Sequence, residues 1–263
     1  DKDNPFNKKS GNYLTILFDD VTDSDARNLV SNIFKREFKK MLQKIGYQKD
    51  YKTLVIGLGN EKSTPDALGP LVTSKLIVTN HFFDMNINVD DKLSKLAAIA
   101  PGVTGQTGIE TSDYVKGVVG VLKPDLVILV DALCSSSIEN VNKSIQVTDN
   151  GISPGSGIGN KRKEISKETL NTKVISVGIP TVIDASTIVS DTINYMVKNY
   201  AYNKSHINEK SNKFIKGPVN YLNKETKITP ADRKNFLGLV GALSDNEIKK
   251  LLDEVLTPIG YNL

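Results

Sequence analysis

Four short runs of apolar residues constrain the fold of this chain more than any other feature. They lie at 53–58, 96–100, 125–130 and 173–179. The spacing between the runs predicts helices at 65–80, 112–122 and 185–200. Continuous apolar strands that alternate with helices are typical of a parallel sheet buried on both faces. The sequence therefore predicts an α/β fold, with a mostly parallel twisted sheet and helices on both faces.

A strand and a long helix are predicted before these runs. Residues 12–19 contain enough β-forming side chains for an edge strand, and apolar residues then recur with helical spacing. The apolar stripe consists of Leu29, Ile33, Phe34, Phe38, Met41, Leu42 and Ile45. We expect this helix to begin at a cap near Thr22 or Asp23 and to end at Gly46.

An insertion separates the third and fourth runs. It contains a possible strand at 144–148, followed by residues 149–166, which are rich in Gly, Ser and Lys. Long irregular stretches inside a compact domain are usually functional or mobile. Further along, 201–228 is polar and aperiodic, which predicts a surface excursion, and two helices are expected within 229–257. We interpret 1–263 as a single α/β domain with inserted loops.

Composition narrows the class of protein. The 263 residues are 39% hydrophobic, which is enough to bury a core. No apolar run approaches the 18 residues of a membrane helix, and the N-terminus lacks the apolar part of a signal peptide. We therefore expect a soluble, intracellular protein without membrane association. The net charge of +4 favours acidic partners without indicating nucleic acid, so no direct nucleic-acid binding is expected.

Asp66 is the first candidate for chemistry. In the segment Thr64-Pro-Asp66 we interpret Thr64 as the N-cap and Asp66 as the second residue of the helix after the first apolar run. An acid in the first turn gains about 0.3–1 kcal/mol from the helix dipole, so a structural role explains it well. Gly57 and Gly59 favour a functional role, because glycines at a strand-to-helix turn let the backbone approach a ligand closely.

Asp131 is the second candidate, directly after the five apolar residues 126–130. A partly buried carboxylate needs partners or a raised pKa, although structural hydrogen bonding would also explain it. If the two strands are parallel neighbours, Asp66 and Asp131 lie at the same edge of the sheet, where open α/β sheets place ligands. Like charges held close together would split their protonation, which leaves one acid and one base.

A glycine-containing loop at 100–110 follows another predicted strand. Its glycines, Gly102, Gly105 and Gly108, can present backbone N–H groups to an oxyanion or a peptide carbonyl. An ordinary glycine-rich turn explains the same residues equally well. Both a binding loop and an ordinary turn remain open, and the loop is a candidate for substrate binding.

A basic cluster lies in the insertion, at Lys161, Arg162 and Lys163. The surrounding segment 154–163 has the glycines of a phosphate loop but not the spacing G-x-x-x-x-G-K followed by Ser or Thr. We expect these cations to bind acidic side chains of a substrate, with a plain solvated loop as the alternative.

The sequence does not contain the motifs that other common catalytic sites require. The third glycine of a dinucleotide-binding turn is absent, so no such cofactor is expected. The two histidines, His81 and His206, lie in polar surroundings and form neither a zinc motif nor an evident Ser-His-Asp triad. We therefore expect no cofactor and no metal, and the aspartates remain the candidates if the chain is a hydrolase.

Several of these motifs resemble the germination protease family of endospore-forming bacteria. The matching segments are 57–60, 64–70, 100–112, 130–133, 151–163, 178–185, 236–243 and 254–256. The resemblance implies an endopeptidase that initiates degradation of small acid-soluble spore proteins during germination. Such enzymes cleave after an acidic residue and before a hydrophobic one. The family's catalytic pair corresponds to Asp66 and Asp131.

The resemblance also implies a fold similar to that of the hydrogenase maturation proteases. It further implies a zymogen with a short propeptide, a homotetramer and a location in the spore core. Our leading hypothesis is aspartic-type cleavage, in which the two aspartates activate a water molecule. Two alternatives remain: a metal-dependent peptidase that uses the same aspartates, and a non-catalytic module that binds acidic proteins or nucleic acid.

Overall fold

A computed structural model describes residues 9–19, 21–85, 93–135, 137–154, 163–185 and 187–195. The chain divides into two compact units, Asp1–Ser135 with Glu139–Val182, and Ser136–Ile138 with Ile183–Leu263, and each is described by itself. The features expected at 201–228 and 229–257 lie outside the described residues, and the single domain over 1–263 stays a prediction.

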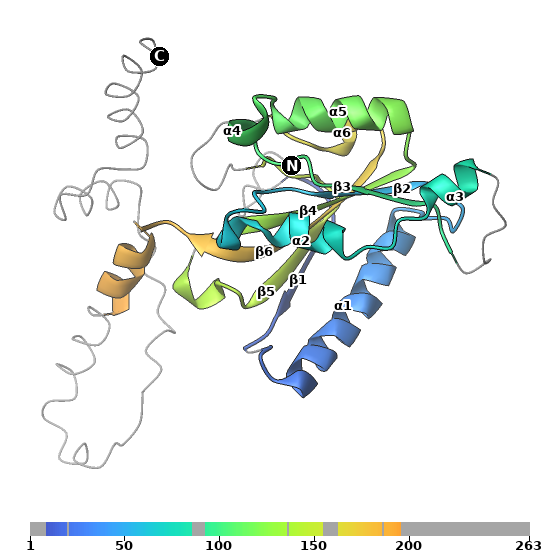
Figure 1. The fold of residues 1–263 in the computed structure, drawn as a ribbon. Coiled ribbons are helices and arrows are strands. Elements are labelled where there is room, and N and C mark those ends of the chain that lie inside the picture. The colour runs from blue at the N-terminus through green and yellow to red at the C-terminus, as the bar shows by residue number, and fades with distance from the viewer. Residues whose placement is uncertain are drawn as a thin grey trace, which may run out of the picture. The chain divides into compact units, whose positions relative to one another are not determined.

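A six-stranded sheet forms the centre of the first unit, in the order β1-β5-β6-β4-β2-β3 (Figure 1). The strands are β1 (Tyr13–Leu17), β2 (Thr53–Gly57), β3 (Leu96–Ile99), β4 (Leu126–Ser135), β5 (Ser144–Thr148) and β6 (Lys173–Ile183). β2 pairs in parallel with both β3 and β4, so the first three apolar runs are neighbouring strands. β5 is antiparallel to β1 and β6, which makes the sheet mixed, and β1 is an edge strand as predicted.

β6 runs in the same direction as β4. Thr172, just before β6, donates a hydrogen bond to the carbonyl of Pro124, just before β4. Further along the two strands, a Cβ at Gly178 would meet the side chain of Leu133. The neighbours β6, β4, β2 and β3 therefore form the parallel part of the sheet that the four apolar runs predicted.

Helices cover both faces of the sheet (Figure 1). One face packs against α5 (Thr111–Leu122) and α6 (Lys167–Leu170), and the other packs against α1 (Ser24–Lys44). The buried core of the first face consists of Leu54, Ile56, Leu58, Val115, Val119, Val127, Leu129, Ile165, Leu170 and Val174. Met41, Leu126, Val147 and Ile175 form the core of the second. The α/β prediction is confirmed.

The long helix α1 has the boundaries that its sequence predicts. The side chain of Asp23 accepts hydrogen bonds from the backbone N–H groups of Asp25 and Ala26, at 3.0 and 2.9 Å, and the chain turns out of the helix at Gly46. The prediction that Leu29 belongs to the buried stripe is wrong, because this side chain is 62% exposed. At 3.6 residues per turn it lies about 120° around the helix from the buried Met41.

The helix predicted at 65–80 is broken. The structure has two pieces in this range, η1 (Thr64–Asp66) and α2 (Leu68–Ser74), and a separate short helix, α3 (Asn80–Asp84), begins at its last residue. A continuous helix would need Pro70 to donate a hydrogen bond to the carbonyl of Asp66, and proline has no N–H to donate. That carbonyl instead accepts a hydrogen bond from the N–H of Asn60, at 3.1 Å.

The helix predicted at 112–122 is α5, which begins one residue earlier than expected, after Glu110 as its N-cap. In the second unit, residues 187–195 are helical, in agreement with the first part of the helix predicted at 185–200. The remainder of that helix lies outside the described residues. Over the described part of the chain, no helix has the length and apolar character needed to span a membrane.

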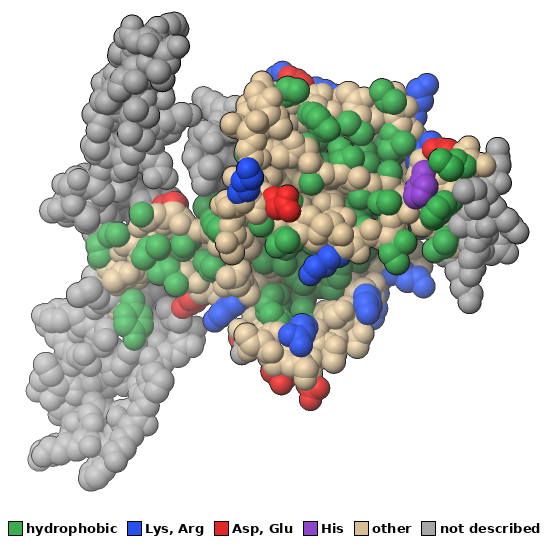
Figure 2. Space-filling view, in the orientation of Figure 1, with side chains coloured by type: hydrophobic (Ala, Val, Ile, Leu, Met, Phe, Trp, Pro, Cys, Tyr) green, Lys and Arg blue, Asp and Glu red, His purple; other side chains and the backbone are tan. Residues whose placement is uncertain are grey.

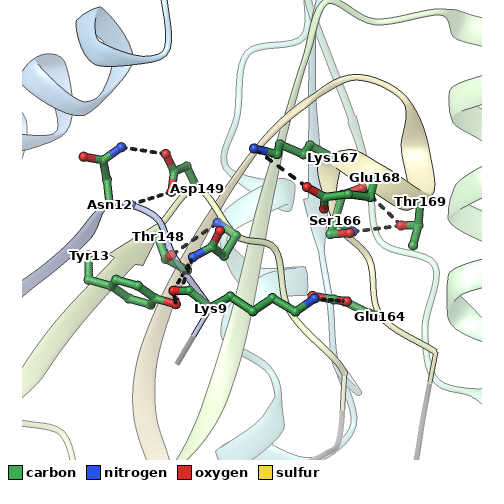
Figure 3. A network of polar contacts seen from close by, with 11 residues as sticks. Lys9, Asn12, Tyr13, Thr148, Asp149, Glu164, Ser166, Lys167, Glu168 and Thr169 are labelled. Carbon is green, nitrogen blue, oxygen red and sulfur yellow. Dashed lines mark hydrogen bonds and ion pairs between the residues drawn. The ribbon is translucent and has the colours of Figure 1, made fainter. Parts of the chain in front are cut away.

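The insertion after β5 is held against the start of β1 by polar contacts (Figure 3). The carboxylate of Asp149 accepts hydrogen bonds from the backbone N–H and the side-chain amide of Asn12, at 2.8 and 2.7 Å. Lys9 forms an ion pair with Glu164, with 2.6 Å between Nζ and Oε1. Both ends of the insertion are thereby fixed to the segment that leads into β1.

Candidate active site

The turn after β2 packs directly on β4. A Cβ on Gly57 would overlap the carbonyl oxygen of Gly69 in α2, and a Cβ on Gly69 would overlap the backbone of Leu58 and lie 2.6 Å from the carbonyl oxygen of Val130. The N–H of Leu58 donates to that same oxygen of Val130, at 2.8 Å. These contacts leave no room for side chains, so they bring the segments that carry Asp66 and Asp131 together.

Asp66 is the last residue of η1 and is partly buried. Its carboxylate oxygen Oδ2 accepts a hydrogen bond from the N–H of Asn60, at 2.8 Å. Gly59 has a φ of 113°, and a Cβ there would overlap the carbonyl oxygen of Asp66. The turn therefore requires glycine at 59. The group that comes close to the backbone of Gly59 is Asp66, where the sequence suggested a ligand.

The predicted helix position of Asp66 needs a correction. Ser63, not Thr64, is the N-cap, and Asp66 is the third residue of a three-residue 3-10 helix. So short a helix has a small dipole, because the dipole grows from peptide units aligned over several turns. The dipole therefore explains little of why an acid occupies position 66.

Asp131 lies within β4 rather than past its end, because β4 continues to Ser135 beside β6. It is 6% exposed, and its Oδ1 accepts a hydrogen bond from the N–H of Ala132 at 2.9 Å. On the other side, β2 ends at Gly57, which is paired with Val130. Asp131 therefore lies one residue beyond the last β2 pair, at the edge of the sheet where the chain turns toward Asp66.

The two carboxyl groups interact. Burial and, second, the negative charge of Asp66 raise the pKa of Asp131 to about 7, against a smaller opposing effect of the Ala132 N–H. Burial also raises the pKa of Asp66, and the hydrogen bond from Asn60 acts in the opposite direction. The structure thus brings together the two aspartates that the sequence singled out, in different environments.

The glycine-containing loop lies at the same edge, because β3 is parallel to β2. A short helix, α4 (Thr104–Thr107), forms its centre. Gly102 and Gly108 have φ values of 73° and 70°, so the backbone there takes a conformation that favours glycine. Gly105 is exposed, with open space around the position of a Cβ.

Three polar residues of this edge, Asn60, Gln106 and Thr181, were not singled out as site residues from the sequence. Nε2 of Gln106, in α4, donates a hydrogen bond to Oδ1 of Asn60 at 2.6 Å. Thr181, in β6, donates from its hydroxyl to the carbonyl of Pro65, at 2.5 Å. All three belong to motifs that carry the resemblance, but only the folded chain shows that they hold the segment of Asp66.

The basic cluster is described in part, since Lys161 and Arg162 lie outside the described residues. Lys163 is exposed, and its Nζ lies 2.9 Å from Oδ2 of Asp113 on α5. The hydrogen bond and charge of Asp113 raise the pKa of Lys163. Lys163 thus pairs with Asp113 rather than with either aspartate of the pair, and its contact with substrate stays a prediction.

Other features of the described residues lie away from the pair. His81 is exposed on α3, and His206 is outside the described part. Within the ranges that the structure describes, no three His, Cys, Asp or Glu side chains gather in a group able to hold a metal ion. A cavity of about 410 Å³ opens at the beginning of β4 and β6, between Pro124 and Thr172, at the edge opposite to Asp131.

The visible face of the molecule carries many exposed apolar side chains and few acidic ones (Figure 2). Leu71 and Ile77 are among the exposed apolar residues in and after α2, and Tyr114 and Val121 are among those of α5. Ile109, in the loop after β3, is exposed as well.

The sheet and the two carboxyl groups define an α/β protein with an aspartate pair at the C-terminal edge of parallel strands. The chain belongs to the germination protease family, which it matches over residues 1–263. It is therefore a protease.

Relatives of similar sequence carry the name germination protease. The protein of Bacillus velezensis is 46% identical over 265 residues, which cover 97% of this chain and 72% of the relative. That of Bacillus licheniformis is 45% identical over 264 residues, with the same coverage of both chains. Among solved structures, the hydrogenase maturation protease HycI of Thermococcus kodakarensis matches 56% of this chain and 90% of its own, with 16% identity and a TM-score of 0.33.

Proposed function

We propose that this protease initiates the degradation of small acid-soluble spore proteins in the spore core during germination, with Asp66 and Asp131 as its catalytic pair. The observation that carries the proposal is the position of both carboxyl groups at one edge of the sheet, where the close packing of Gly57, Gly69 and Val130 brings their segments together. The names of the relatives support the setting in germination.

The environments of the two aspartates suggest how they divide the work. Asp66 is partly open to solvent and accepts a hydrogen bond from Asn60, which favours its ionised form and suits a general base. Asp131 is buried, with a pKa raised to about 7 by burial and by the charge of Asp66, so it holds a proton below that pH. A protonated, buried carboxyl group suits a general acid.

In the proposed reaction, Asp66 takes a proton from a water molecule whose oxygen bonds to the scissile carbonyl carbon. The C–N bond then breaks, and the leaving amine receives the proton of Asp131. After this step Asp66 is protonated and Asp131 ionised. Transfer of one proton from Asp66 to Asp131, directly or through water, restores the starting state.

Substrate binding is assigned to two segments. We place the scissile strand against the loop that carries Gly102, Gly105 and Gly108, where Gly105 leaves the backbone accessible. The cations Lys161, Arg162 and Lys163 would pair with acidic side chains, in agreement with cleavage after an acidic residue. The family resemblance adds a zymogen with a short propeptide and a homotetramer to the proposal.

A cleavage experiment tests this function. The protein is incubated with a purified small acid-soluble spore protein, and the products are mapped by mass spectrometry. We expect a small number of cuts, each between an acidic and a hydrophobic residue. Binding of the substrate without any product, over a range of pH and protein concentration, would instead favour a non-catalytic module.

A further inference from the structure

The segment of Asp66 is tied to the neighbouring loop by two successive hydrogen bonds. Nε2 of Gln106 donates to Oδ1 of Asn60 at 2.6 Å, and the backbone N–H of Asn60 donates to Oδ2 of Asp66 at 2.8 Å. Oδ1 of Asn60 also accepts from the N–H of Lys62, at 2.9 Å. Asn60 therefore links Gln106, in the loop after β3, to the carboxylate of Asp66, in the segment after β2.

The surroundings of Gln106 fix which end of its amide faces Asn60. Its oxygen Oε1 lies 3.5 Å from the backbone N–H of Val103, a donor, and so is the acceptor end. A Cβ on Gly102 would lie 3.1 Å from the same oxygen, so glycine leaves the space that this rotamer occupies. The NH₂ group must then point to Asn60, and a glutamate at 106 would have no proton to donate.

Gln106 is exposed and holds no place in the core. Its side chain forms hydrogen bonds with Asn60 and Val103, both in loops at the catalytic edge. An exposed hydrogen bond of this kind contributes little to folding, because water competes for both groups. Its effect is therefore expected on the local geometry of the turn around Asp66.

We propose that Gln106 is a positioning residue, which holds Asn60 so that its N–H stays on the carboxylate of Asp66. The hydrogen bond between Gln106 and Asn60 links the segment of the proposed base, Asp66, to the loop that carries Gly102, Gly105 and Gly108. Movement of the loop, which is assigned to substrate, would then move Asp66 with it. This inference rests on the proposed function, because it takes Asp66 as the base.

Gln106→Ala removes the donor, and Gln106→Glu keeps the side-chain length while removing the same donor. The control is Gln43→Ala, the same change at an exposed position of α1. We expect both Gln106 variants to lower kcat by about 3- to 10-fold, the range of one lost hydrogen bond. KM should change by less than about twofold, because both substitutions leave the glycines of the substrate loop in place and the lost hydrogen bond acts on the base.

The pH dependence separates positioning from a general structural effect. The N–H of Asn60 favours ionised Asp66, so a less well-held Asn60 moves the acidic limb of kcat/KM to higher pH. The melting temperature should equal that of the wild type. In an Asn60→Ala background, Gln106→Ala should have no further effect, because its acceptor is already gone.

Asp66→Asn is assayed beside these variants. Wild-type kcat and an unmoved acidic limb in both Gln106 variants, with Asp66→Asn inactive, would overturn the role of Gln106 and leave the proposed function standing. An active Asp66→Asn would overturn the proposed function, and the role of Gln106 with it. Equal losses in Gln106→Ala and Gln43→Ala would also contradict positioning.

Discussion

Asp131 is buried beside Asp66, and its burial and the negative charge of Asp66 both raise its pKa. Asp66→Asn removes the charge but leaves the burial. We therefore expect the pKa of Asp131 to fall in this variant and yet to stay above its ordinary value of 3.8. Titration of the carboxyl carbons by NMR measures this. An unchanged pKa would show that the two groups do not interact.

The carboxyl group of Asp131 also makes the stability of the protein depend on pH. Its pKa is higher in the folded chain, so between about pH 4 and 7 the folded state binds the proton that the unfolded state releases. Stability from Asp131 is present below pH 4 and is lost as pH rises through 7. From pH 4 to 8, the free energy of unfolding should fall more in the wild type than in Asp131→Asn.

The size of that difference follows from the pKa shift of Asp131. A shift from 3.8 to about 7 corresponds to on the order of 4 kcal/mol, at 1.36 kcal/mol per pKa unit. Asparagine keeps an oxygen that accepts the Ala132 N–H, so the comparison leaves that hydrogen bond in place. Urea denaturation at several pH values measures the free energy of unfolding of both proteins. The same dependence on pH in the wild type and in Asp131→Asn would contradict a raised pKa at Asp131.

Gly69 should tolerate no larger residue. In Gly69→Ala the new Cβ would overlap the backbone of Leu58, and we expect a loss of about 1–3 kcal/mol or more in stability. The matched control is Gly120→Ala in α5, where a Cβ meets nothing within 4 Å. Alanine there should stabilise the helix by about 0.5–1 kcal/mol. In thermal unfolding we expect the melting temperature to fall in Gly69→Ala and to rise in Gly120→Ala. Equal changes in the two variants would contradict the close approach of α2 to β2.

Metal removal distinguishes the two enzymatic hypotheses. The proposed mechanism routes every proton through Asp66 and Asp131, so dialysis against EDTA should leave kcat unchanged. A metal-dependent peptidase using the same aspartates would lose activity and regain it on addition of a divalent cation. Activity is measured before and after dialysis, with the metal content determined by elemental analysis.

The fold and the pair were predictable where local sequence decides the structure. The apolar runs specified the parallel strands, and Asp23 and Gly46 specified the limits of α1. The break before α2 was also readable, because Pro70 cannot donate to the carbonyl of Asp66. The helix predicted from residue 65 onward does not include this break.

Other features depend on contacts between distant segments. The extension of β4 past Asp131 depends on its neighbour β6, which lies some forty residues later in the chain. The bond between Gln106 and Asn60 exists because parallel pairing of β2 and β3 brings their following loops together. No local pattern around residue 106 specifies that partner.

The central claim is that Asp66 and Asp131 carry the chemistry, and cleavage of a small acid-soluble spore protein by Asp131→Asn tests it most directly. The control is Asp50→Asn, the same change at an exposed aspartate outside the site. Loss of the proton donor should lower kcat by at least about 100-fold at unchanged fold, while Asp50→Asn cleaves at the wild-type rate. Wild-type cleavage by folded Asp131→Asn would contradict the account.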